Sequence, residues 1–237
     1  MQLIDALLDS VDGDRQVASR VRIGLHWLAV ESRHTGMAHV FPGRPDFELP
    51  NAGALQGLEV MELAAGLKSW EPLEAGLGLA ALSSLIDAQG ERLNVVDYIM
   101  DRVPGQTVTC IGRFPFFPDL AQAAKRAFLL EINPQAGELP SFAAEEVVPQ
   151  SDLLILTATS LINKTMERLL ELARAANATA IVLGPSTPMS DVLFDFGASV
   201  IAGIRVTDRV RLFRSLSQGV KFYNKIAGIE PVTRFRK

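Results

Sequence analysis

From residue 103 onward, short apolar runs alternate with stretches of helical periodicity. A continuous apolar run is typical of a parallel strand that is covered on both faces. Such runs predict strands at residues 107–111, 127–132, 153–157, 180–183 and 200–202. The intervening periodicity predicts helices at residues 94–100, 119–126, 163–177, 190–196 and 208–218. Strands and helices that alternate in this way specify a parallel sheet with right-handed crossovers, so we predict a Rossmann-like α/β domain at residues 93–237.

The first ninety residues have a different pattern. An amphipathic helix is predicted at residues 3–11, and two strand-like runs follow at 21–30 and 35–41, joined by a hairpin turn at 31–34. After a loop at 43–57, helices are predicted at 55–67 and 72–86. The second helix is rich in small residues and apolar nearly all round, which indicates burial. We predict a smaller α+β domain at residues 1–92, with the boundary near 87–94.

Two predicted strands run directly into turns that are rich in hydroxyl groups. The run at 180–183 is followed by Gly184, Pro185, Ser186 and Thr187, in which proline fixes φ while the hydroxyls and N–H groups stay available. Because ligands of open α/β sheets bind beyond the carboxyl ends of the strands, this turn is a predicted binding loop.

The strand at 153–157 leads into a similar turn. The turn contains Thr157 and Thr159. The side chain of Asn163 or of Thr165 is expected to cap the N-terminus of the helix that follows. The free N–H groups of a helix start favour an anionic ligand group.

Two further loops complete the expected site. Gly112 and Phe114 follow the first predicted strand of the α/β half, but the Gly-x-Gly-x-x-Gly turn is missing, so dinucleotide binding is not supported. Glu131 and Asn133 end the next strand. They serve either as ligand-bonding and general-base groups or as a strand-terminating turn with a surface carboxylate. The predicted ligand-binding residues are Gly112, Phe114, Glu131, Asn133, Thr157, Thr159, Asn163, Thr165, Gly184, Pro185, Ser186 and Thr187.

Soft metal ligands are scarce in this chain. They are His26, His34, His39 and Cys110, and no two have the close spacing of a zinc site. We interpret His34 as a turn residue, His39 as a strand residue and Cys110 as a small buried hydrophobe. Ser186 has no histidine downstream to act as its base. Neither a metal ligand nor a catalytic residue is assigned, and a metal carried by a small chelator stays open as a cofactor.

Composition narrows the class of protein. The chain has 237 residues, of which 48% are hydrophobic and 21% charged, as in an ordinary globular protein. A single cysteine excludes an intramolecular disulfide and fits a reducing cytosol. The first residues lack the pattern of a signal peptide, and no run reaches the ~20 apolar residues of a membrane helix. We therefore expect a cytoplasmic protein without membrane insertion.

Basic residues gather at the end of the chain. Residues 203–237 hold nine Lys/Arg against two Asp/Glu, while the remainder has a net charge of −11. One interpretation is attraction of phosphate or nucleic acid. The other is an outer helix and edge strand that complement the acidic body or a second subunit. No nucleic-acid motif accompanies the charge, so we expect no nucleic-acid partner and leave a homo-oligomer open.

These segments together resemble a known family, the "putative heavy-metal chelation" family with its N-terminal partner domain. The matching segments of the second half are residues 108–115, 131–134, 139–140, 148–152, 157–165, 183–188 and 202–203. Residues 24–27, 36–38 and 73–81 resemble the partner domain. The resemblance implies an N-terminal domain similar to that of enolase, a Rossmann-like domain, and a site in the cleft between them. The chain departs from the family where Ser83 and Ser84 replace an expected Asn-Ala pair, which alters a ligand contact if that Asn faces the cleft.

We therefore hypothesise a protein that binds a small polar molecule or a metal chelate (metallophore) between two domains. Ser186, Thr187 and Asn163 would hold its polar groups, and Glu131 would coordinate it or act as a base. The alternatives are an enzyme that acts on a small polar or phosphorylated metabolite in the same cleft, and an oligomeric scaffold. Perturbed carboxylates and histidines in the cleft would favour the enzyme, whereas hydroxyls and amides would favour binding.

Overall fold

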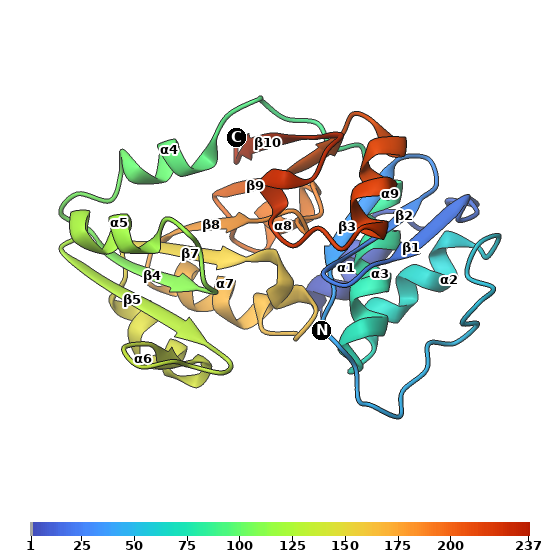
Figure 1. Ribbon diagram of the computed structural model, residues 1–237. Coiled ribbons are helices and arrows are strands. Elements are labelled where there is room, and N and C mark those ends of the chain that lie inside the picture. The colour runs from blue at the N-terminus through green and yellow to red at the C-terminus, as the bar shows by residue number, and fades with distance from the viewer. Residues whose placement is uncertain (1) are drawn as a thin grey trace.

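The larger of two β-sheets carries the C-terminal half of the chain (Figure 1). The computed structural model describes residues 2–237. The strands of this large sheet are β4 (Thr107–Ile111), β5 (Arg126–Glu131), β6 (Leu139–Pro140), β7 (Leu153–Thr157), β8 (Thr179–Leu183), β9 (Val200–Val206) and β10 (Ile229–Phe235). Their order across the sheet is β10-β9-β8-β7-β4-β5-β6, and only the β9–β10 pair is antiparallel. Numbered along the chain from β4, the six parallel strands lie in the order 3-2-1-4-5-6, which is that of a Rossmann fold.

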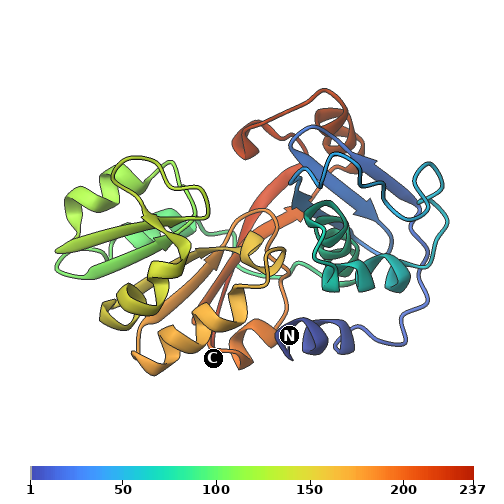
Figure 2. The same cartoon turned by 90° about the horizontal axis from the view of Figure 1, so that it is seen from below.

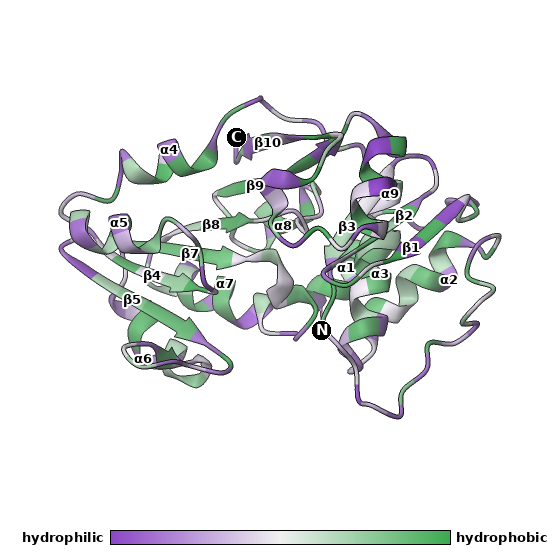
Figure 3. Ribbon diagram, in the orientation of Figure 1, coloured by the Kyte–Doolittle hydropathy of each residue, from purple (hydrophilic) through white to green (hydrophobic). Residues whose placement is uncertain are grey.

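Helices cover both faces of the large sheet, as the predicted α/β class requires. Apart from a last helix at residues 209–217, the α-helices of this half are α4 (Val95–Met100), α5 (Phe117–Ala123), α6 (Ala144–Val147), α7 (Met166–Ala175) and α8 (Val192–Asp195). Side chains alternate between the faces: Cys110 and Ile155 pack with Leu120 of α5, whereas Leu154 packs in the same core as Leu170 of α7. Because both faces are covered, the central strands β7 and β8 are apolar over most of their length, as the hydropathy colours of Figure 3 show.

The small sheet is antiparallel and lies beside the β9–β10 side of the large one (Figures 1 and 2). Its strands are β1 (Arg20–Ile23), β2 (Trp27–Glu31) and β3 (Thr35–His39), and its helices are α1 (Gln2–Asp9), α2 (Val60–Ala65) and α3 (Pro72–Leu85). Leu28 and Val30 face the core that contains α3. Trp27 and Ala29 face Phe213 of α9 (Arg209–Ser217) instead. Helix α9, from the end of the chain, thus covers the face of the small sheet that lies opposite α3.

One predicted strand was wrong. The apolar run at 21–30 forms two strands, β1 and β2, because the chain reverses at residues 24–26, where the N–H of Gly24 donates to the carbonyl of Trp27 at 2.9 Å. A Cβ atom at Gly24 would lie 2.5 Å from the carbonyl oxygen of Leu216. The reversal therefore occurs where the backbone of α9 approaches, which local sequence does not reveal.

The other differences concern the ends of elements. The predicted helix at 163–177 begins only at Met166, because residues 158–161 form a 3-10 helix before it. Neither expected cap forms: Thr165 makes no side-chain cap bond, and Asn163 closes a turn ahead of the helix. The helix predicted at 55–67 is shorter, Val60–Ala65, and runs into a 3-10 turn. Beyond these end differences, strands β6 and β10 and helix α6 were not among the elements predicted from the hydrophobic pattern; both strands lie at edges of the sheet.

Several contacts join the two halves of the chain. The N–H of Leu3 donates to Glu167 in α7 at 3.2 Å, and Glu91 pairs with Thr233 in a bridge to β10. A single apolar core contains residues of both sheets. The boundary at residues 92 and 93 stays a prediction, as does the likeness of the first part to enolase. Across residues 2–237, no helix combines the length and the apolar character needed to cross a membrane.

Candidate functional site

A cavity of about 1000 Å³ lies at the carboxyl ends of the parallel strands. Its lining includes ten of the twelve residues predicted from the sequence, from the loops after β4, β5, β7 and β8. They are Gly112, Phe114, Glu131, Thr157, Thr159, Asn163, Thr165, Gly184, Pro185 and Ser186. Asn133 and Thr187 are outside the lining. Because parallel strands end at the same edge of the sheet, loops that are more than seventy residues apart in the chain meet at this cavity.

Gly112 and Thr157 mark the topological switch point of the sheet. β4 and β7 are neighbours, but the chain continues from them toward opposite edges, which opens a crevice between their C-terminal loops. Gly112 has φ +104°, and a Cβ atom there would lie 3.0 Å from Cγ2 of Thr157. Glycine therefore lets the two loops approach closely. Thr157 Oγ1 lies 2.9 Å from Thr159 Oγ1 and accepts the N–H of Thr159 at 3.3 Å, so the second loop is held by its own hydroxyls.

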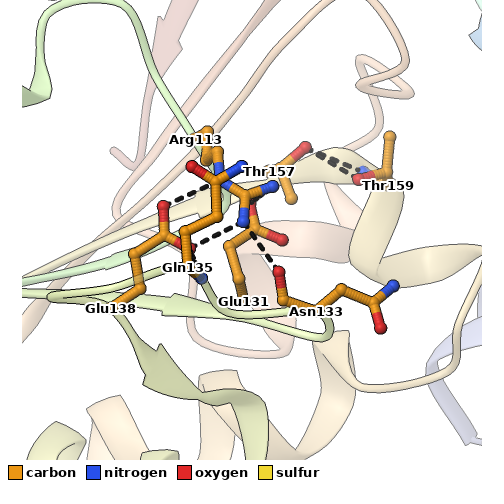
Figure 4. A network of polar contacts seen from close by, with 7 residues as sticks. All are labelled: Arg113, Glu131, Asn133, Gln135, Glu138, Thr157 and Thr159. Atoms are coloured by element: carbon orange, nitrogen blue, oxygen red, sulfur yellow. Dashed lines mark hydrogen bonds and ion pairs between the residues drawn. The ribbon is translucent and has the colours of Figure 1, made fainter.

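Arg113 organises the rim between the first two loops (Figure 4). Its guanidinium donates to both carboxylate oxygens of Glu138, at 2.8 and 2.6 Å, and to the carbonyl of Asn133 at 2.7 Å. The hydrogen bonds between the two side chains, and then their opposite charges, lower the pKa of Glu138 and raise that of Arg113. Glu131 is farther away, with Oε1 4.0 Å from Arg113 Nη1. Asn133 thus contributes its backbone to the rim, while Glu131 borders the cavity.

The Gly184–Thr187 loop (residues 184–187) connects the two sheets. Ser186 is 2% exposed, and its Oγ accepts the backbone N–H of His39 at the end of β3, at 3.0 Å. Thr187 turns back on the loop itself, where its hydroxyl donates to the carbonyl of Gly184 at 2.8 Å. The hydroxyl of Ser186 therefore has a structural partner in addition to its place in the lining.

We expect Ser186→Ala to lower the free energy of unfolding by ~1–3 kcal/mol, because it leaves the partly buried N–H of His39 without an acceptor. Urea denaturation followed by circular dichroism measures the change. Ser190→Ala is the matched control, since Ser190 is also buried but its Oγ only accepts the N–H of Val192 in its own turn, at 3.3 Å. Equal losses in the two variants would contradict a role for Ser186 in joining the sheets.

The turn before α7 presents amide and hydroxyl groups to the cavity. Asn163 Oδ1 accepts the N–H of Thr165 at 3.1 Å and its hydroxyl at 2.7 Å, and both residues line the cavity. Lys164 between them has φ +67° and points the other way, with Nζ donating to the carbonyl of Leu67 at 2.6 Å. Burial lowers the pKa of Lys164 to about 8. The turn is thus anchored to the N-terminal part by a lysine outside the lining.

An aromatic wall on the small-sheet side was not predicted. It consists of Trp27, His39 and Phe41, with ring centroids 5.1 Å apart for the first pair and 4.8 Å for the second. The indole N–H of Trp27 donates to the carbonyl of Lys221 at 2.9 Å, which holds the segment bearing Tyr223 at the cavity. Burial, and then the charge of His26, lower the pKa of His39. The alternation of side chains along β2 and β3 indicates which residues share a face of the small sheet. Which of the two faces borders the cavity depends on how the small sheet packs against the large one.

Ser160 was also missed. It is fully buried, borders the cavity, and its Oγ has no hydrogen-bond partner within residues 2–237. Its position within the hydroxyl-rich run after β7 was the available signal.

Metal donors do not converge in the part of the chain that the structure describes. Residues 2–237 contain no group of three His, Cys, Asp or Glu side chains placed to hold one ion. The cavity lining holds only His39 and Glu131 of these types. Cys110 lies fully buried in β4, where burial raises the pKa of its thiol to about 12, so it is not available as a thiolate. This donor set does not fit an ion chelated by the protein alone.

Two features of the sequence lie away from the cavity. Ser84 donates to the carbonyl of Ala81 at 2.7 Å and lies 2.7 Å from the hydroxyl of Ser32, and neither Ser83 nor Ser84 lines the cavity. The basic C-terminal stretch forms α9 and the edge strand β10. Arg205 pairs with Glu230 inside the stretch, whereas Arg209 pairs with Glu31 and Arg234 with Asp191, which lie outside it. The two pairs with residues outside the stretch agree with the second interpretation, in which the basic stretch complements the acidic body.

Comparison with known proteins identifies both parts of the chain. Residues 94–230 match the model of family DUF364, and residues 4–86 match that of DUF4213; both are described as "putative heavy-metal chelation". A DUF364 protein of unknown function from Desulfitobacterium hafniense has a similar structure, with a TM-score of 0.88 and 27% identity over 99% of this chain and 98% of the other. Another from Pyrococcus horikoshii has a TM-score of 0.81 and 18% identity over the same shares. No curated protein matches the chain. The resemblance seen in the sequence is confirmed: this chain belongs to family DUF364, whose description is "putative heavy-metal chelation".

Proposed function

We propose that the protein binds a small organic molecule, free or as a metal chelate, in the cavity at the carboxyl end of the large sheet. The observation that carries this proposal is the gathering of ten predicted residues around one cavity of about 1000 Å³ at the switch point. Such a volume suits a metabolite-sized ligand, and apolar walls with a few polar groups are typical of small-molecule sites. Thr159 and Asn163 would bond the polar groups of the ligand.

A metal would enter this cavity as cargo that is already bound to an organic chelator. The family description supports metal handling, but His39 and Glu131 are the only His, Cys, Asp or Glu in the described lining. Two such side chains leave most of the coordination sphere to other donors. The chelator would supply those donors, and the aromatic wall would contact its organic part.

An enzyme that acts on a small metabolite is the second candidate, and His39 is the observation in its favour. Its pKa is lowered and it lines the cavity, so at neutral pH the imidazole would be unprotonated and able to accept a proton. Hydroxyls and amides otherwise make up most of the polar lining, which favours binding. A cytoplasmic location and a homo-oligomeric state stay predictions.

Native mass spectrometry with elemental analysis tests the proposal on protein purified without added metal or chelator. We expect a stoichiometric organic or metal-chelate adduct that is lost in the double variant Thr159→Val/Asn163→Ala. Thr207→Val, an exposed residue outside the lining, is the control and should keep the adduct. An adduct that persists in the double variant would place the site elsewhere. Should the purified protein carry nothing, a metabolite thermal-shift screen without any hit would contradict the proposal.

A further inference from the structure

Glu131 occupies the position of a ribose-binding acid in a Rossmann unit. β4, α5 and β5 form the first βαβ unit of the large sheet, and Glu131 is the last residue of β5. It lies 19 residues after Gly112, which forms the turn at the end of β4. In nucleotide-binding Rossmann units, an acidic residue ~20 residues after the first turn accepts hydrogen bonds from the ribose hydroxyls.

The carboxylate of Glu131 lacks protein donors. Its side chain is 19% exposed and borders the cavity, yet within residues 2–237 no N–H or O–H group donates a hydrogen bond to it. The nearest cation is Arg113, whose Nη1 lies 4.0 Å from Oε1 of Glu131. Its short hydrogen bonds are donated to Glu138 and to the carbonyl of Asn133 instead (Figure 4). An ionised carboxylate only accepts, so both of its oxygens require donors from water or a ligand. A vicinal diol supplies two such donors.

The same unit has no place for a diphosphate. In dinucleotide-binding units, glycines and the free N–H groups at the helix start hold the phosphates. Here the turn continues from Gly112 into Arg113 and Pro115, and the seven-residue helix α5 has Pro118 in its first turn, which removes an N–H. The rings of Phe114 and Phe116 stack within the lining instead, with centroids 5.2 Å apart and 17° between planes. This loop offers a flat aromatic surface where a diphosphate site would offer N–H groups.

We propose that the cavity takes a ribonucleoside without a diphosphate, whose ribose diol donates to Glu131 and whose base lies against Phe114. The inference rests on the proposed function and narrows its ligand to one chemical class. Glu131 acts here as a specificity residue that distinguishes a ribose from a deoxyribose, since the 2′-hydroxyl is one of the two donors it receives.

Isothermal titration calorimetry on the full chain tests this. The probes are adenosine, guanosine, cytidine and uridine, each compared with its 2′-deoxy counterpart. We expect at least one ribonucleoside to bind at least ~10-fold more tightly than its deoxy form, in the range of a hydrogen bond to a charged group. Glu131→Gln should weaken that ribonucleoside by a similar factor while leaving the deoxynucleoside within about twofold. Glu146→Gln, on α6 outside the lining, is the control and should change neither affinity.

Three results would overturn the inference. They are no binding of any of the four ribonucleosides, equal binding of ribo and deoxy forms, and a Glu131→Gln variant that weakens both forms equally, which would indicate a merely structural role. These failures are distinguishable from failure of the proposed function. A non-nucleoside adduct that is lost in Thr159→Val/Asn163→Ala would leave the cavity as a binding site and exclude only this ligand class.

Discussion

Replacing Gly78 by alanine is expected to lower the free energy of unfolding by ~2 kcal/mol or more. Gly78 lies in the middle of α3, where an added Cβ would be 2.1 Å from the backbone N and 2.8 Å from the Cα of Leu67. Those neighbours are main-chain atoms that cannot turn aside, so the helix itself must move. Overpacking of a core costs ~1–3 kcal/mol and sometimes more, which outweighs the ~1 kcal/mol that alanine gains over glycine in a helix. Chemical denaturation followed by circular dichroism measures the loss.

Gly76→Ala in the same helix is the matched control. Its Cβ would lie 3.3 Å from the carbonyl oxygen of His39, a tight contact that a shift of a few tenths of an ångström relieves, and at an ordinary 3.6 Å from the side chain of Leu28. Because the helix-propensity gain applies equally to both positions, we expect Gly76→Ala to change stability by less than ~1 kcal/mol. Similar losses in the two variants would show that close approach of α3 to Leu67 is not what requires glycine at position 78.

Gly112→Ala is expected to lower the free energy of unfolding by ~2–3 kcal/mol and to weaken ligand binding. Two effects contribute: φ +104° is unfavourable for any residue with a Cβ, and that Cβ would lie 3.0 Å from Cγ2 of Thr157. The turn at the switch point would then shift away from β7. Urea denaturation gives the stability, and the native mass spectrum gives the retention of the adduct.

A double-mutant cycle with Thr157→Ser separates the two effects. Serine removes Cγ2 but keeps the hydroxyl that accepts the N–H of Thr159. In the Thr157→Ser background, we expect Gly112→Ala to cost about 1 kcal/mol less than in the natural chain, the remainder being backbone strain. A cost that is the same in both backgrounds would show that the contact with Thr157 does not contribute.

Much of the fold and of the candidate site could be predicted because each part depends on a local rule. The strands at 107–111 and 153–157 have the predicted bounds. A strand that is buried on both faces is a continuous apolar run, and the charged or small residues on either side of the run mark its ends. The lining residues from four loops could be predicted because parallel strands deliver their carboxyl ends to one edge of the sheet. Neither step requires knowledge of which strands are neighbours.

What remained hidden depends on contacts between distant segments. The run at 21–30 has the composition of one strand, but α9, nearly two hundred residues later, packs against its turn at Gly24. The same docking turns Trp27 toward α9 and the cavity. His39 could be assigned to a strand from its neighbours, whereas its place in the aromatic wall and its bond to Ser186 follow from how the small sheet meets the large one.

The sequence by itself therefore determined the class of the fold, most of its elements and the edge of the sheet at which the polar loops meet, because periodicity and strand-end chemistry are local properties. Only the tertiary structure decided the partners of those loops: Ser186 bonds to β3, Lys164 turns away toward Leu67, and Glu131 is left without a protein donor. The physical reason is that a side chain's hydrogen bonds and burial depend on which segments pack beside it, and those segments lie far away along the chain.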